Sequence, residues 1–108
     1  MVDDPVVAVV RSSLAALREA GIHASKAVVF GSYARGGASD DSDIDLLVVA
    51  PEFDNPRDRA LTQLLWRLRL NTDRRIEPIG VGERRWENVH SHPLLAVARE
   101  EGLVISAA

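Results

Sequence analysis

The sequence has no cysteine, no excess of basic charge and no long apolar run, and each absence excludes a class of protein. Without cysteine the chain forms neither a disulfide framework nor a thiolate metal site. The formal net charge of -3 argues against a dedicated nucleic-acid binder, which needs a basic surface to displace counterions from phosphates. The N-terminus carries acids where a secretory signal carries bases, and no apolar run reaches membrane-spanning length. We therefore expect a cytoplasmic protein without a membrane segment.

The length and composition predict a single domain over residues 1–108. A chain of 108 residues is too short for two separate cores, and 46% of its residues are hydrophobic while 27% are charged. These proportions are typical of a folded domain and not of a disordered tail. The expected domain therefore has one core and no room for an accessory substrate-recognition domain.

Hydrophobic spacing and start and stop residues predict helices and strands that share one core. Apolar residues three and four apart indicate helices, several of which begin at a proline, and short apolar runs indicate strands. The expected helices span residues 5–20, 56–70, 83–89 and 93–101, and the expected strands span residues 27–30, 44–49, 75–81 and 103–105. Pro78 places its strand at a sheet edge or a bulge, because proline donates no hydrogen bond. Gly21 and Gly102 are expected to end their helices. This order indicates an α/β or α+β layer structure.

The segment from residue 57 to 75 is locally basic, although the whole chain is acidic. It contains two aspartates and six arginines, which are Arg57, Arg59, Arg67, Arg69, Arg74 and Arg75. These side chains form either a solvated helix face or a docking surface for an acidic partner or a polyphosphate. Trp66 lies among leucines of the same helix, so we expect it in the core or at an interface.

Two aspartates stand at the start of the strand expected at residues 44–49. Because side chains alternate across a strand, Asp43 and Asp45 project side by side on one face. Each carboxylate repels the other unless a cation lies between them. Hard divalent ions suit such oxygen ligands, and Mg²⁺ suits them best when phosphate oxygens and water complete its coordination shell.

A glycine-serine pair directly follows the strand expected at residues 27–30. Gly31 lets the backbone come close to a ligand, and Ser32 with the amides after it can donate hydrogen bonds to an anion. The stretch lacks the lysine of a P-loop and the glycine spacing of a dinucleotide-binding fingerprint. A phosphate cradle next to a metal-binding carboxylate pair is how an enzyme would hold a nucleoside triphosphate with its metal.

These residues together resemble a known signature. Gly31-Ser32, a gap of ten residues and Asp43-Ile44-Asp45 match the pattern of the DNA polymerase β-like nucleotidyltransferase superfamily. GSYARG followed by SDIDLLV is similar to its smallest members, the minimal nucleotidyltransferases. The resemblance implies an α/β (α+β) fold with a small mixed β-sheet flanked by helices. It also implies Mg²⁺-dependent transfer of a nucleoside monophosphate, most simply AMP from ATP, to a hydroxyl group.

The resemblance assigns the loop residues to the nucleotide. Gly31 and Ser32 would hold the triphosphate. Arg35 would either contact a phosphate or tie the loop to a nearby aspartate. The two alternatives for Arg35 differ in whether the side chain touches the substrate.

The resemblance assigns the carboxylates to the metal. Asp43 and Asp45 would bind two Mg²⁺ ions. A third carboxylate on a later strand would share the ion that activates the attacking hydroxyl, and Glu77 is the candidate. The family more commonly has aspartate there, and a glutamate on an edge strand also needs no function.

Finally, the resemblance implies a protein partner. Small members of the family are often antitoxins that adenylylate a tyrosine of a partner toxin of the HEPN ribonuclease class. We therefore expect an antitoxin that acts on such a toxin and forms a hetero-oligomer with it, with the arginine-rich segment as the docking surface. The alternative is a non-catalytic binding module that neutralises its partner by occlusion.

Overall fold

The computed structural model describes residues 4–31, 42–55, 59–88 and 93–107. Its elements follow in the order α1 (Asp4–Glu19), β1 (Lys26–Phe30), β2 (Ile44–Val49), η1 (Pro51–Asp54), α3 (Arg59–Leu68), η2 (Arg69–Asn71), β3 (Ile76–Val81), α4 (Glu83–Glu87), α5 (Pro93–Glu101) and β4 (Leu103–Ser106). The predicted helices and strands are confirmed within these residues, and the short 3₁₀ helices η1 and η2 are additional. Across the described ranges, no helix is both long and apolar enough to cross a membrane.

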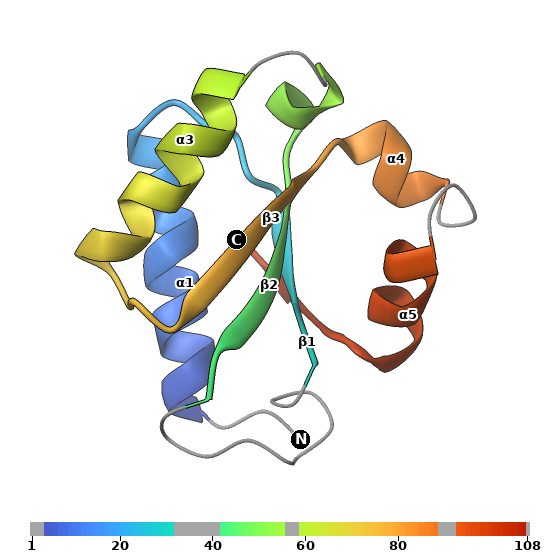
Figure 1. The fold of residues 1–108 in the computed structure, drawn as a ribbon, viewed down its shortest axis with the longest axis horizontal. Helices are drawn as coiled ribbons and strands as arrows, with labels where there is room; N and C mark the ends of the chain where they lie inside the picture. Colours follow the sequence, from blue (N-terminus) through green and yellow to red (C-terminus); the bar gives the residue numbers. More distant parts are fainter. Residues whose placement is uncertain (1–3, 32–41, 56–58, 89–92, 108) are drawn as a thin grey trace.

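The strands of the described residues form one mixed sheet in the order β3-β2-β1-β4 (Figure 1). β1 is antiparallel to both β2 and β4, whereas β2 and β3 run parallel. Parallel neighbours need a crossover connection, and this one contains α3. Pro78 lies in β3, an edge strand, as its missing amide proton predicted. The expected α/β class with a mixed sheet is confirmed.

Helices cover both faces of the sheet, with α1 and α3 on one side and α4 and α5 on the other (Figure 1). On β2, Ile44, Leu46 and Val48 pack in the core beneath α1 and α3. Leu47 and Val49 belong to the second core, which α4 and α5 cover. Because β2 is buried on both faces, its sequence is almost continuously apolar.

α1 ends where the sequence predicts, in a turn that depends on glycine. Gly21 has a φ of +94°, in the left-handed region. Its N–H donates to the carbonyl of Arg18 at 3.1 Å, and the N–H of Ile22 donates to the carbonyl of Leu17 at 2.9 Å. This pair of hydrogen bonds defines a Schellman motif. The motif returns the chain to the sheet at Ile22, which is 1% exposed.

α3 packs on the first face through a leucine stripe. Leu65 is buried, and Leu61, Leu64 and Leu68 are partly buried against the same core. Trp66 follows Leu65 and points about 100° away around the helix. It is 41% exposed, so the core, one of the two places expected for it, is excluded. Its role at an interface stays a prediction.

A turn at residues 73–75 sets where β3 begins. The Asp73 carboxylate accepts hydrogen bonds from the backbone N–H of Arg75 at 2.9 Å and from its guanidinium at 2.7 Å. The Arg75 carbonyl in turn accepts from the N–H of Ile44 at 2.7 Å, where β2 starts. The guanidinium hydrogen bonds lower the pKa of Asp73, against the opposing effect of burial. The turn therefore supports the register that pairs Asp45 with Glu77.

We expect Asp73→Asn to lower the free energy of unfolding at neutral pH by about 1 kcal/mol, because a neutral amide replaces a carboxylate that accepts charged hydrogen bonds. The folded-state pKa of Asp73 lies below its ordinary value of 3.8. The stabilisation is therefore complete above that value and is lost as the pH falls through the lower folded-state pKa.

Denaturant titrations of both proteins over a range of pH check this prediction. The difference between wild type and Asp73→Asn should shrink below about pH 4. A difference that persisted undiminished into strong acid would contradict it. Glu100→Gln removes an exposed carboxylate on α5 and should leave the stability at neutral pH unchanged.

Candidate active site

A row of paired residues crosses the sheet from β1 through β2 to β3. Phe30 pairs with Asp45, and Asp45 pairs with Glu77. Directly paired residues point to the same face, so Asp45 and Glu77 lie together on the side of α4 and α5. Asp43 lies one residue before β2 and is exposed. The parallel pairing of β2 with β3 thus brings the third candidate carboxylate to the predicted pair.

The three carboxylates act on one another electrostatically. The pKa of Glu77 is raised, first by the negative charge of Asp43 and then by partial burial, by the charge of Asp45 and by a hydrogen bond to Asp43. The positive charge of Arg69 opposes this rise. Several carboxylate oxygens that repel one another are the donor chemistry that a hard divalent cation such as Mg²⁺ prefers. The residues present therefore fit the expected metal.

The three carboxylates do not converge tightly enough to form a closed ligand set. Among the described residues, no group of three histidine, aspartate or glutamate side chains is close enough together to hold a metal ion. Asp43, Asp45 and Glu77 as metal ligands therefore stay a prediction that the backbone register supports.

Gly31 lies directly against the carboxylate of Asp45. Its φ of +75° is in the left-handed region. A β-carbon at this position would lie 2.2 Å from the Asp45 Oδ2 atom and 3.1 Å from its Cγ atom. The left-handed backbone conformation therefore favours glycine, and a larger residue would also require the Asp45 carboxylate to move. Gly31, the first residue of the candidate phosphate cradle, therefore packs closely against Asp45, one of the candidate metal ligands.

Ser32 and Arg35, the other candidate nucleotide-binding residues, lie outside the described residues. Their roles stay predictions. Gly31 is the part of the candidate cradle that the structure describes, and it marks the point where the chain leaves β1.

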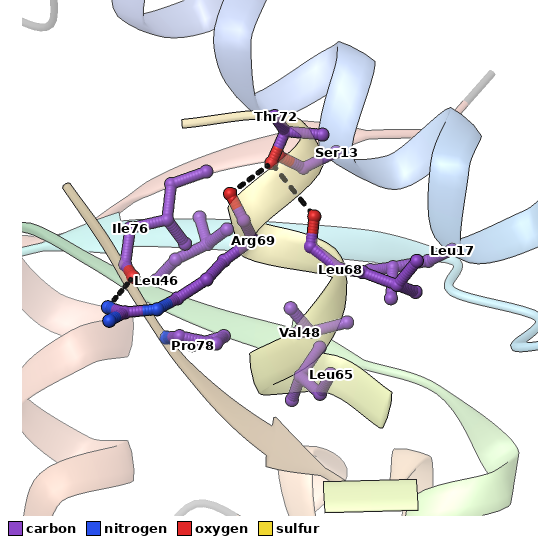
Figure 2. Close-up of a pocket in the computed structure, with 10 residues that line it drawn as sticks. All are labelled: Ser13, Leu17, Leu46, Val48, Leu65, Leu68, Arg69, Thr72, Ile76 and Pro78. Carbon is purple, nitrogen blue, oxygen red and sulfur yellow. Dashed lines mark hydrogen bonds between the residues drawn. The ribbon is translucent and has the colours of Figure 1, made fainter. Parts of the chain in front are cut away.

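The sequence did not single out Arg69, which lies beside the carboxylates. It begins η2, and its guanidinium donates to the carbonyl of Ile76 at 3.0 Å (Figure 2). Ile76 immediately precedes Glu77 in the edge strand, which explains why the charge of Arg69 acts on that carboxyl. The hydrogen bond from Arg69 to Ile76 joins η2 to β3 across a turn, so no local sequence motif predicts it. The arginine excess of residues 57–75 pointed to the region but not to this residue.

A small cavity beneath Arg69 is not a nucleotide site. It lies between α1, α3 and the sheet and is lined mainly by apolar side chains (Figure 2). Its free space is about 20 Å³, which holds about one water molecule. At its rim the Ser13 hydroxyl donates to the hydroxyl of Thr72 at 3.4 Å. The cavity is a packing gap on the face opposite the carboxylates.

The fold and the carboxylate row can be compared with known proteins. The family model of the nucleotidyltransferase domain matches residues 10–86 of the chain. The protein belongs to this family. The match spans β1, β2 and β3 and therefore includes Gly31, Asp43, Asp45 and Glu77. The resemblance to nucleotidyltransferases is confirmed, and with it membership of a transferase family.

A solved structure shares the fold of this nucleotidyltransferase domain. It is a candidate nucleotidyltransferase from Sulfolobus solfataricus, 17% identical in sequence, with a TM-score of 0.63. The comparison covers 91% of this chain and 77% of the other. At this identity the likeness shows the shared fold. No curated protein matches the sequence of this nucleotidyltransferase domain.

We expect Gly31→Ala to abolish the response of this domain to Mg²⁺ with ATP, because the added methyl group displaces the Asp45 carboxylate. Gly21→Ala is a matched control, since Gly21 is also left-handed but has no atom within 4 Å of the position that a methyl group would take. Both variants should lose about 1 kcal/mol of stability from the backbone conformation. Thermal unfolding with and without Mg²⁺ and ATP should show a raised midpoint for wild type and Gly21→Ala only. An unchanged response in Gly31→Ala would contradict the prediction.

We expect Glu77→Gln to raise the thermal midpoint of the ion-free protein at neutral pH. The folded state raises the pKa of this carboxyl, so it disfavours the charged form, and a neutral amide removes that repulsion. Calorimetry in a chelating buffer measures the effect. Glu87→Gln, at an exposed position on α4, should leave the midpoint unchanged. A lower midpoint for Glu77→Gln would show that Glu77 serves the edge strand and not the carboxylate cluster.

Proposed function

We propose that this protein is a Mg²⁺-dependent enzyme that transfers AMP from ATP to a hydroxyl group of a partner protein. The observation that carries the proposal is the pairing of Asp45 with Glu77 next to Gly31, in a chain of the nucleotidyltransferase domain family. The two carboxylates stand beside a left-handed backbone position that favours glycine. A metal-bound triphosphate needs both features.

The reaction exchanges one phosphorus–oxygen bond for another. The acceptor oxygen bonds to the α-phosphorus of ATP, and the bond from that phosphorus to the oxygen bridging to the β-phosphate breaks. Pyrophosphate leaves with the bridging oxygen, and the proton of the acceptor hydroxyl passes to solvent. When bound, Mg²⁺ neutralises phosphate charge and lowers the pKa of the acceptor hydroxyl.

The candidate residues assign the metal and the triphosphate to different strands. Asp43 and Asp45 would hold Mg²⁺ at the start of β2, with Glu77 completing the ligand set from β3. Gly31 and Ser32 would bind the triphosphate on the side of β1. Since β3 and β1 flank β2 on opposite sides, the acceptor hydroxyl would approach from the side of β3.

The partner that we infer is a HEPN-class ribonuclease toxin modified at a tyrosine, with this protein as its antitoxin in a hetero-oligomer. The resemblance of the stretch from Gly31 to Asp45 to minimal nucleotidyltransferases supports this inference. Exposed arginines of α3, Arg59 and Arg67, support an acidic docking partner.

Catalysis is favoured over simple occlusion of the partner. Occlusion requires a complementary surface but neither a carboxylate row nor a glycine whose β-carbon would collide with a carboxylate. Repulsion between Glu77 and Asp43 is unfavourable in the isolated fold. A binding module has no reason to keep it.

The double variant Asp43→Asn/Asp45→Asn tests the proposal. With Mg²⁺, ATP and a ribonuclease of the HEPN class, the wild type should add the mass of AMP to the ribonuclease. The variant should lose transfer by about a thousandfold or more, because both metal ligands on β2 are removed. Intact-mass spectrometry of the ribonuclease over time measures the transfer.

A matched control removes two charges elsewhere. Glu100→Gln/Glu101→Gln alters two exposed positions at the end of α5 and should transfer AMP at the wild-type rate. If Asp43→Asn/Asp45→Asn still neutralised the ribonuclease fully, occlusion and not catalysis would be the mechanism.

A further inference from the structure

An exposed aromatic side chain lies at the C-terminal end of α3. Trp66 is 41% exposed and Leu70, in η2, is 54% exposed. The guanidinium carbon of Arg69 lies 4.7 Å from the centroid of the Trp66 ring. We name Trp66, Arg69 and Leu70 the edge patch. Exposed tryptophan and arginine side chains in contact are typical of protein interfaces.

Arg69 connects the edge patch to the candidate active site. Its guanidinium reaches from the α3 side of the sheet to the carbonyl of Ile76, at the edge of β3 (Figure 2). The next residue is Glu77, on which its charge acts. Arg69 therefore links the edge patch, on the α3 side of the sheet, to the β3 edge from which the acceptor would approach.

The charge of the edge patch selects among partners. An acidic segment can pair with Arg69, whereas that arginine repels a basic segment. The nearby carboxylates and the net charge of -3 repel the continuous phosphate backbone of a nucleic acid. A protein segment with carboxylates and an aromatic ring fits the combination best, because its ring can stack on Trp66 while its charge meets Arg69.

We propose that the edge patch docks the acceptor polypeptide through acidic residues next to the hydroxyl that is modified. This inference rests on the proposed function, which it extends by naming the surface and the chemistry of the acceptor segment. Arg69 would pair with an acceptor carboxylate, and Trp66 would contact the acceptor side chain that bears the hydroxyl. Glu77 directly follows Ile76, whose carbonyl accepts from Arg69, so docking on the edge patch brings that hydroxyl toward the carboxylates.

Tryptophan fluorescence provides a direct test, because Trp66 is exposed whereas Trp86 is 6% exposed. The probes are synthetic peptides with one tyrosine flanked by glutamates, by serines or by lysines, and an oligouridylate. The full chain is titrated with each probe in the presence of Mg²⁺ and a non-hydrolysable ATP analogue. We expect saturable binding of the glutamate peptide about tenfold tighter than of the lysine peptide. The signal should be absent in Trp66→Phe.

Two variants separate docking from folding. Arg69→Gln should weaken binding of the glutamate peptide by about fivefold or more. Leu70→Glu leaves Trp66 and Arg69 in place, and its like charge should weaken the same peptide while leaving the thermal midpoint unchanged. A substitution that altered only the midpoint and not peptide binding would overturn the inference.

Arg99 offers a matched control on the other face of the sheet. Its guanidinium lies 5.3 Å from the Trp86 ring centroid and donates to the Trp86 carbonyl at 3.2 Å. Because Trp86 is buried, this pair cannot receive a partner in the same way. Arg99→Gln should bind the glutamate peptide as the wild type does. Equal losses in Arg69→Gln and Arg99→Gln would overturn the inference.

Failure of the inference is distinguishable from failure of the proposed function. A raised thermal midpoint with Mg²⁺ and ATP, but equal affinity for all three peptides, would overturn the edge patch as a docking surface. Peptide selectivity without any response to Mg²⁺ and ATP would support the edge patch and overturn nucleotide transfer. Tighter binding of the oligouridylate than of any peptide would overturn the inference in favour of an RNA surface.

Discussion

The parallel pairing of β2 with β3 is the constraint on which the candidate site depends. Backbone hydrogen bonds across these strands hold Glu77 opposite Asp45 although their charges repel. The buried faces of β2 provide the opposing stabilisation, because Ile44 and Leu46 lie in one core and Leu47 lies in the other. A sheet covered on both faces can therefore keep acidic side chains together where an isolated strand pair could not.

Two residues flank this acidic row with opposite physical effects. On the side of β1, Gly31 removes steric bulk, so that the backbone comes close to Asp45. On the side of β3, Arg69 adds positive charge at the sheet edge and offsets part of the repulsion felt by Glu77. The two sides of the site therefore differ. On the side of β1 the backbone of Gly31 lies close to Asp45, and on the side of β3 the positive charge of Arg69 lies next to exposed Trp66. This asymmetry is the basis for assigning triphosphate and acceptor to different sides.

Much of the fold was predictable because local rules and tertiary packing agree. The bounds of β2 and α5 match their predicted ranges, since apolar runs and proline and glycine positions mark both ends. The helix η1 was not predicted, because Pro51 indicated the end of a strand but not the start of a helical turn. For Trp66 the sequence left core and interface open, because a leucine stripe defines the buried face of a helix but not the exposure of the residues beside it.

By itself, the sequence predicted that Asp43 and Asp45 point to one side, because alternation is a local property of extended backbone. It also determined that a glycine follows β1. Only the tertiary structure decided that Gly31 abuts Asp45, that Glu77 joins the pair and that Arg69 lies beside it. The physical reason is that strand order and register arise from burying two cores at once, which no local spacing encodes.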